Sequence, residues 1–169
     1  MDEHTRRLLL DLEEFGHRHS GYYNISADTG QFFNILIRIA KSKNILEVGT
    51  SNGYSTIWLG DAAKQNKGKV TTIEISEHKV KMALENFKRA KLDKTIKIMH
   101  GDALKEIPKL KDTFDFLFLD AVKEDYINYF KLAYPKLTKN AIIVADNAIM
   151  FEKYMKDYLN HVRNHKNLK

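Results

Sequence analysis

The segment NILEVGTSNGYS, residues 44–55, joins a short apolar strand to a helix through a turn that contains two glycines. The strand part is apolar apart from Asn44 and Glu47, which is typical of a strand covered on both faces. Gly49 and Gly53 let the backbone of the turn approach a ligand closely, and the helix that follows presents free N–H groups. The segment therefore predicts a strand–turn–helix unit with a ligand site at the turn.

The same alternation continues along the rest of the chain and predicts an α/β fold. Short apolar runs typical of buried strands occupy Ile45–Val48, Val70–Ile75, Ile96–Met99, Phe114–Leu119 and Ala141–Ala145. Helical patterns separate or follow them, at Tyr54–Gln65, Glu77–Lys91, 102–107, Lys123–Tyr134 and 151–164. Strands that alternate with helices form a doubly wound parallel sheet with helices on both faces. Two further helices are expected before the first strand, over residues 2–15 and 28–40.

Length and composition fit one folded domain spanning residues 1–169, with an N-terminal helical segment (1–40) and a core (44–165). The chain is 43% hydrophobic and 30% charged, too apolar for a disordered protein. The longest apolar run, Ala141–Ala145, is far shorter than the roughly 20 residues of a membrane helix. The acidic start at Asp2 and Glu3 is unlike a signal peptide, so we expect a cytoplasmic protein with no membrane partner. Since the chain has no cysteine, disulfides, thiolate zinc sites and cysteine nucleophiles are excluded.

The net charge of +6 raises the alternative of a nucleic-acid partner. Residues 64–111 contain 13 Lys and Arg against 6 Asp and Glu, more than the whole excess. Within the helix Glu77–Lys91, lysines such as Lys79 and Lys81 alternate with apolar residues, as on the solvated face of an amphipathic helix. The pattern favours charge that serves solubility, and a surface that meets a polyanion stays open as the alternative.

In a doubly wound sheet, ligands bind beyond the carboxyl ends of the strands. The first turn has the spacing G-x-x-x-G, which argues against the G-x-G-x-x-G of a dinucleotide site and lacks the Gly-Lys-Ser/Thr of a triphosphate loop. Glu74 ends the second strand, where an acid binds the ribose hydroxyls in nucleotide-binding sheets. Gly101 and Asp102 follow the third strand in a turn suited to an adenine edge. A glycine turn and an exposed carboxylate without any ligand are the simpler alternatives.

Three oxygen-bearing side chains follow the fourth and fifth strands: Asp120, Asp146 and Asn147. Such a set suits a hard cation, Mg²⁺ first, with Ca²⁺ and Mn²⁺ as alternatives. A helix cap and a turn residue are the alternative roles for the two aspartates. Lys123 comes three residues after Asp120, where neighbouring cations could lower its pKa enough for a general base, although most lysines at helix starts are simply solvated.

In their order and spacing, these motifs resemble the cation-dependent S-adenosylmethionine O-methyltransferases, the family that includes catechol and caffeoyl-CoA O-methyltransferases. The resemblance covers residues 20 to 165 and is carried by Asn24-Ile25-Ser26, by residues 45–55, by Thr72-Ile73-Glu74, by Gly101-Asp102-Ala103, by Asp120, Lys123 and Tyr126, and by Asp146-Asn147. It implies a Rossmann-like sheet in the order 3-2-1-4-5 and S-adenosylmethionine as the cofactor.

The resemblance also implies a role for each matched residue. Asn24 and Ile25 flank the cofactor, Gly49 and Ser55 hold its methionine part, Glu74 binds the ribose, and Asp102 with Ala103 lies at the adenine. Asp120, Asp146 and Asn147 bind the cation, and Asp120 and Lys123 are catalytic, with Lys123 as the general base. The full set of implied cofactor-binding residues is Asn24, Ile25, Glu47, Gly49, Thr50, Ser51, Gly53, Tyr54, Ser55, Glu74, Ile75, Gly101, Asp102, Ala103 and Asp120.

Two features depart from the family. Many microbial members have Asp-Ala-Asp-Lys where this chain has Asp120-Ala121-Val122-Lys123, so a carboxylate beside the acceptor is replaced by Val122. Members also continue into two further strands that help to wall the acceptor pocket, and these strands are not expected in this sequence. The sheet edge that they would cover is then open, which favours a homodimer.

The expected function is methyl transfer from S-adenosylmethionine to a hydroxyl of a small, catechol-like aromatic, with a divalent cation lowering the pKa of the accepting hydroxyl. One alternative is the same chemistry on a hydroxylated wobble uridine of tRNA, which the basic middle segment permits. The other is a non-catalytic protein that binds S-adenosylmethionine.

Overall fold

The computed structural model describes residues 1–168, and its centre is a five-stranded, wholly parallel sheet in the order β3-β2-β1-β4-β5. This order confirms the expected doubly wound arrangement. The strands are β1 (Asn44–Val48), β2 (Lys69–Glu74), β3 (Ile96–His100), β4 (Phe114–Leu119) and β5 (Leu137–Ala145). The order of the strands reverses between β1 and β4, so the carboxyl ends of these neighbours border a crevice suited to a ligand.

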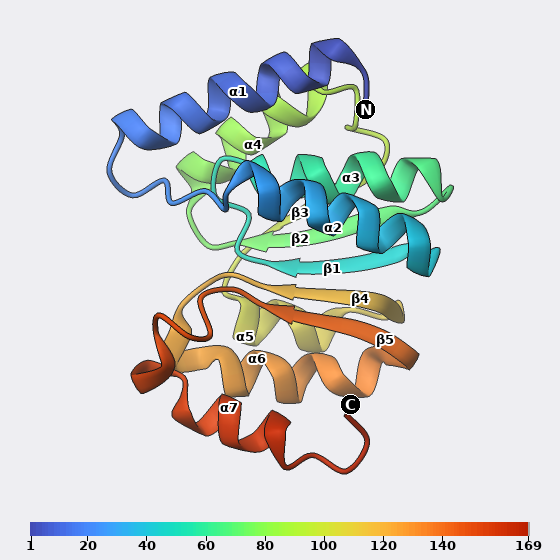
Figure 1. Cartoon of the computed structure of the whole chain (residues 1–169), viewed down its shortest axis with the longest axis vertical. Coiled ribbons are helices and arrows are strands. Elements are labelled where there is room, and N and C mark those ends of the chain that lie inside the picture. The colour runs from blue at the N-terminus through green and yellow to red at the C-terminus, as the bar shows by residue number, and fades with distance from the viewer. Residues whose placement is uncertain (169) are drawn as a thin grey trace.

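Helices cover the two faces of the sheet in separate groups (Figure 1). On one face lie α1 (Glu3–Arg18), α2 (Ala27–Ala40), α3 (Tyr54–Gln65) and α4 (Glu77–Arg89). On the other face lie α5 (Ala103–Glu106), α6 (Tyr126–Ala133) and α7 (Lys156–Arg163). Each face has its own apolar core, because alternate residues of a strand point to opposite sides. Ile45 of β1 belongs to the first core, for example, and its neighbour Leu46 to the second.

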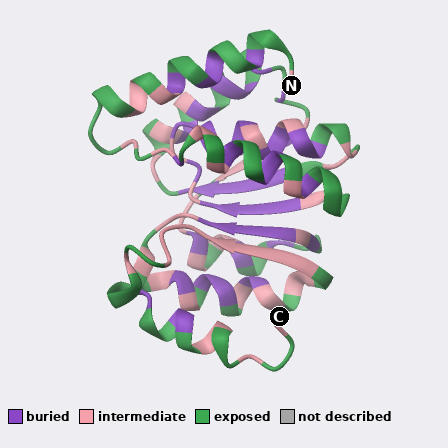
Figure 2. Ribbon diagram, viewed as in Figure 1, coloured by how far each residue is buried: buried purple, intermediate pink, exposed green. Residues whose placement is uncertain are grey.

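The central strands are buried and the edge strands are not, as Figure 2 shows. In β1, β2 and β4 nearly every residue is buried, whereas β5 is half-buried or exposed along its whole length. The sequence pattern predicted burial on both faces for all five strands, and for β3 and β5 this was wrong. An edge strand has a neighbour on one side alone, and its other side is open to solvent. Apolar composition does not show whether a strand lies at the edge or in the centre of a sheet.

Side-chain caps explain where several of the helices begin. The side chains of Asp2, Ser26 and Ser76 accept hydrogen bonds from the backbone at the starts of α1, α2 and α4. The helix expected from Lys123 begins at Tyr126 instead, because a 3-10 turn occupies Lys123–Asp125. The last helix begins at Lys156 rather than at 151, after a 3-10 turn over Glu152–Tyr154. Within residues 1–168, none of the helices combines the length and apolar character that crossing a bilayer requires.

Candidate functional site

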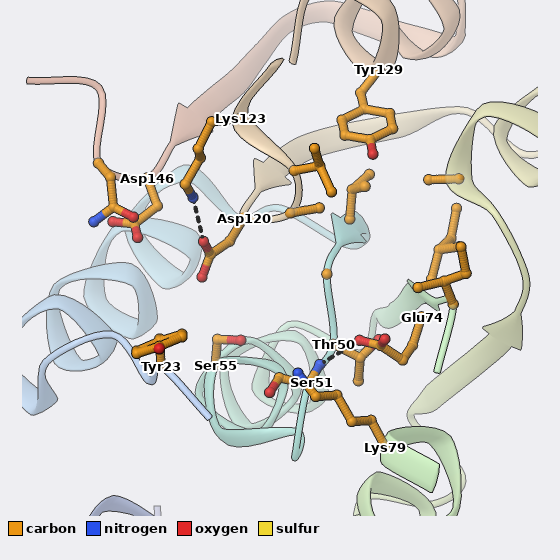
Figure 3. Close-up of a pocket in the computed structure, with 18 of the residues that line it drawn as sticks. Tyr23, Thr50, Ser51, Ser55, Glu74, Lys79, Asp120, Lys123, Tyr129 and Asp146 are labelled. Carbon is orange, nitrogen blue, oxygen red and sulfur yellow. Dashed lines mark hydrogen bonds and ion pairs between the residues drawn. The ribbon is translucent and has the colours of Figure 1, made fainter. Parts of the chain in front are cut away.

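A cavity of about 610 Å³ lies at the carboxyl ends of the strands. Most of the side chains predicted to form the site line this cavity, so the fold collects residues from six separate chain segments. Those residues are Asn24, Ile25, Gly49, Thr50, Ser51, Ser55, Glu74, Ile75, Gly101, Asp102, Ala103, Asp120, Lys123, Asp146 and Asn147. Figure 3 shows that Asp120, Lys123 and Asp146 lie together on one side of the cavity, away from Ser51 and Glu74.

Three residues expected to bind the cofactor, Glu47, Gly53 and Tyr54, lie behind the cavity wall. Glu47 is fully buried and accepts hydrogen bonds from Ser55 Oγ (2.7 Å), Thr56 Oγ1 (2.5 Å) and Thr72 Oγ1 (2.6 Å). Burial raises the pKa of its carboxyl to about 7, although the three hydroxyl donors oppose the shift. Glu47 therefore joins β1, β2 and the first turn of α3, and supports the site from behind.

The β1–α3 turn needs both of its glycines. Gly49 has φ of +101°, and a Cβ placed on it would lie 2.0 Å from the carbonyl oxygen of Asp120. Gly53 has φ of +88°, and its Cβ would lie 2.7 Å from the ring of Phe87. The first glycine lets the turn pass against the end of β4, and the second starts α3 with a left-handed residue. The turn thereby brings the β1 and β4 sides of the cavity together.

Glu74 forms the opposite side of the cavity from Asp120. One of its carboxylate oxygens accepts a hydrogen bond from the backbone N–H of Ser51 (2.8 Å) and the other from that of Ser76 (2.9 Å). These bonds fix the carboxylate at the end of β2. Each oxygen has a further lone pair available for a hydroxyl donor, which is the chemistry that a ribose requires.

Asp120, Lys123 and Tyr126 form a chain of contacts on the other side. Lys123 Nζ donates to Asp120 Oδ1 (2.8 Å) and to Tyr126 Oη (2.7 Å), and Tyr126 O–H donates to the carbonyl of Leu119 (2.9 Å). Burial raises the pKa of Asp120 to about 6 despite Lys123, with Asp146 adding to the shift. Burial also raises the pKa of Tyr126 above its ordinary value, so its hydroxyl stays neutral.

The same corner holds the donors expected to bind a cation. Asp146 is close enough to Asp120 to raise its pKa, and Asn147, with φ of +58°, follows it in the turn after β5. Two neighbouring carboxylates and an amide oxygen form a hard donor set, and a cation between them would relieve their repulsion. Within residues 1–168 no cluster of three or more His, Cys, Asp and Glu side chains is suited to a metal ion. The oxygen donors present at this corner, two carboxylates and the side-chain amide of Asn147, are of the type that a hard cation takes.

Several residues of the cavity were not predicted as site residues. Lys79, expected on a solvated helix face, lines the cavity beside Ser51 and Glu74. Its position in the first turn of the helix after Glu74 was the available signal. Tyr129, Met150 and Phe151 add apolar surface, and no sequence signal distinguished them from core residues. Val122, noted as a departure from the family pattern, is 56% exposed and also lines the cavity.

Known protein sequences are similar to this chain over most of its length. Residues 2–168 fit the profile of a family described as O-methyltransferase. The chain belongs to the O-methyltransferase family. Catechol O-methyltransferase from Niastella koreensis is 37% identical over 130 residues, which cover 75% of this chain and 58% of that protein. Caffeoyl-CoA O-methyltransferase 2 from Populus trichocarpa is 31% identical over an alignment of 174 residues, with 91% and 69% covered.

Solved members of the O-methyltransferase family have the same fold. The O-methyltransferase from Bacillus cereus, in complex with SAH, matches with a TM-score of 0.84 and 26% identity over 96% of this chain and 80% of that one. TomG from Streptomyces achromogenes, in complex with SAM, also has a TM-score of 0.84 and 26% identity, with 96% and 78% covered. The chain spans a little over half the length of several curated relatives, 56–58%.

Proposed function

We propose that this chain transfers the methyl group of S-adenosylmethionine to a hydroxyl oxygen of a small, catechol-like aromatic. The observation that carries the proposal is one cavity with two chemically different sides. Glu74 and the β1–α3 turn present groups suited to a nucleoside and an amino acid, and Asp120, Asp146 and Asn147 present groups suited to a cation. Solved relatives in complex with SAH or SAM support the choice of cofactor. Relatives named for catechol and caffeoyl-CoA support the choice of acceptor.

The cofactor side assigns a task to each group already described. The Glu74 carboxylate accepts the ribose hydroxyls, since its oxygens are fixed by Ser51 and Ser76. The backbone N–H of Ser55 and the other free N–H groups at the start of α3 face the methionine carboxylate, which a helix N-terminus favours, while the Ser55 hydroxyl donates to Glu47. Asn24 and Ile25 close this side, and Gly101, Asp102 and Ala103 border the adenine.

On the acceptor side, Asp120, Asp146 and Asn147 would hold the cation. When bound, a divalent cation supplies an electrophile that orients the hydroxylated acceptor and lowers its hydroxyl pKa. Lys123 is the general base in this proposal, and Tyr126 and Asp120 keep its Nζ at this corner. Tyr129 and Phe151 provide apolar surface for an aromatic ring and exclude water. The chain thus contributes mainly orientation and proton transfer.

The deciding experiment is a methyl-transfer assay with labelled S-adenosylmethionine. The acceptors are catechols, monophenols and hypomodified tRNA, each with Mg²⁺ and with excess chelator. We expect methylation of a catechol that chelator abolishes. Transfer that is unchanged in chelator contradicts the role of the cation, and transfer to tRNA alone contradicts the small acceptor. Cofactor binding without transfer to any acceptor would indicate a non-catalytic protein.

A further inference from the structure

Residues 19–25, here called the strap, cross the edge of the cavity between α1 and α2. Gly21, Tyr23, Asn24 and Ile25 of the strap line the cavity together with residues of the sheet. Tyr23 is 85% exposed although it borders the cavity, so the strap is a thin outer wall. Any ligand that fills the cavity from this side must pass the strap.

The two ends of the strap are anchored to helices and to the core. At the first end, the His19 ring stacks on Phe15 of α1 at 4.1 Å between centroids. At the second end, Asn24 Nδ2 donates to the carbonyl of Leu12 (2.9 Å), and Ile25 is buried in the core. Gly16 leaves the space for this approach, since its Cβ would lie 2.7 Å from Asn24 Nδ2.

The middle of the strap is fastened by Lys79. Its Nζ donates to the carbonyl oxygen of Gly21 (2.8 Å) and lies 5.2 Å from the centre of the Tyr22 ring. Tyr22 in turn packs edge-on against Phe15 of α1, at 5.0 Å. Within residues 1–168, the hydrogen bond from Lys79 is the one that joins residues 20–23 to the sheet-bearing part of the chain. It bridges α4 and the strap across the border of the cavity.

The position of Lys79 on α4 supports a specific purpose for this contact. Lys79 lies in the first turn, three residues after the N-cap Ser76. A positive charge is disfavoured there, because the free N–H groups already make that end of a helix positive. The carbonyl of Gly21 and the face of Tyr22 supply the negative partners that the helix end lacks. Local helix preference does not account for Lys79, but the contact with the strap does.

We infer that Lys79 is a positioning residue that holds the strap closed over the cofactor end of the cavity and slows exchange of the cofactor. The inference rests on the proposed function for the identity of the ligand. Lys79 acts through the strap and not at the reacting atoms, so its loss speeds release of the ligand and leaves the acceptor side unchanged. Each opening of the strap requires the contacts with Gly21 and Tyr22 to break.

The test uses the full chain and S-adenosylhomocysteine as the probe. Lys79→Met keeps the aliphatic stem and removes the charge, and Lys79→Arg restores a donor. Tyr22→Leu removes the ring that contacts Lys79, and Tyr22 itself does not line the cavity. Lys81→Met is the matched control, since Lys81 forms an exposed ion pair with Glu77 on the same helix. The readouts are the dissociation rate of labelled S-adenosylhomocysteine and hydrogen–deuterium exchange of the strap amides in ligand-free protein.

We expect Lys79→Met and Tyr22→Leu to speed dissociation, by about five- to tenfold for the lysine, and to speed exchange in the strap but not in α3. Lys79→Arg should recover most of the effect, and Lys81→Met should match the wild type. Faster dissociation in Lys79→Met with unchanged strap exchange would overturn the inference, because Lys79 would then contact the ligand directly. Wild-type rates in Lys79→Met overturn it as well. If the wild type does not bind the probe, the proposed function fails and the inference fails with it.

Discussion

Asp120 interacts with the other charged side chains of its corner of the cavity, Lys123 and Asp146. It directly follows β4, accepts a hydrogen bond from Lys123, and lies beside Asp146 in surroundings that raise its pKa to about 6. A carboxyl in this state is easily neutralised by a proton or a cation, and in the proposed function Asp146 and Asn147 bind the cation together with Asp120. The same residue lies against the Gly49 turn, so it couples the two sides of the cavity.

Replacing Asp146 should therefore separate binding from turnover. We predict that Asp146→Ala keeps its affinity for S-adenosylhomocysteine and loses about 100-fold or more of the cation-dependent transfer rate, as expected for a missing ligand. Calorimetry with S-adenosylhomocysteine and a rate assay across Mg²⁺ concentrations measure the two effects. Asp157→Ala, at an exposed position of α7, is the control. Equal loss of cofactor affinity and rate in Asp146→Ala would contradict this assignment.

The raised pKa of Glu47 predicts how the stability of the fold depends on pH. Its carboxyl has a pKa of about 7 in the folded chain, raised by burial from 4.5. Between these values the folded state keeps a proton that the unfolded state has lost, so stability falls as pH rises from 4.5 to 7. In Glu47→Gln this contribution is absent, and the stability difference between the two proteins should shift in favour of the variant by up to about 3 kcal/mol.

Urea unfolding of wild type and Glu47→Gln at several pH values from 4.5 to about 8 measures this shift. Glu106→Gln, at a partly exposed carboxyl outside the β1–α3 turn, serves as the control. A stability difference between wild type and Glu47→Gln that is constant over this range would contradict the raised pKa.

At the scale of elements, the β1–α3 turn organises the site. It is supported from behind by Glu47, passes Asp120 at Gly49, and enters α3 through Gly53. Gly53 and Gly21 share the same φ of +88° but differ in their surroundings. A Cβ on Gly53 would meet the ring of Phe87, whereas a Cβ on Gly21 would have nothing within 4 Å.

This pair allows backbone strain to be separated from packing. Gly21→Ala should lower the free energy of unfolding by about 1–2 kcal/mol, which is the cost of the left-handed backbone conformation alone. Gly53→Ala should lower it by a further 1–3 kcal/mol, roughly the cost of overpacking against Phe87, and should also weaken cofactor binding. Denaturant titrations of both variants test this, and equal losses would show that Phe87 yields without cost.

At the scale of the whole molecule, β5 pairs with β4 alone within residues 1–168, so it forms an open edge of the sheet. The apolar segment Ala141–Ala145 is half-buried and uncharged, and such an edge is a template for pairing with another strand. We therefore predict that the 169-residue chain forms a homodimer through β5. Light scattering after gel filtration should give twice the monomer mass at micromolar concentration.

A charge on the edge should dissociate this dimer. Ala141→Lys is the disrupting variant, because Ala141 is half-buried in β5 and lies outside both apolar cores, and Asn160→Lys on the exposed side of α7 is its control. Circular dichroism should show that both variants stay folded. A monomeric wild type at every concentration, or a dimer that Ala141→Lys leaves intact, would contradict the β5 interface.

Much of the site could be predicted because a parallel sheet brings the carboxyl ends of its strands to one edge. Alternating apolar runs located β1 to β5, and the polar residues directly after them, from Gly49 to Asn147, therefore had to converge. The limits of the helices were less legible at Lys123 and at 151, where 3-10 turns come first. The exposure of the edge strand β5 could not be predicted from the sequence, since Ala141–Ala145 has the composition of a central strand.

The sequence by itself determined the fold class, the strand ends that form the site, and the residue types suited to a nucleoside and a cation. Only the tertiary structure decided on which side of the turn each group lies. Glu47 is next to the turn in sequence, yet it points behind the wall to Thr72 of a different strand. Lys79 has the spacing of a solvated lysine, yet it meets Gly21, 58 residues away. Periodicity reports the face of an element, and packing between distant segments decides what that face meets.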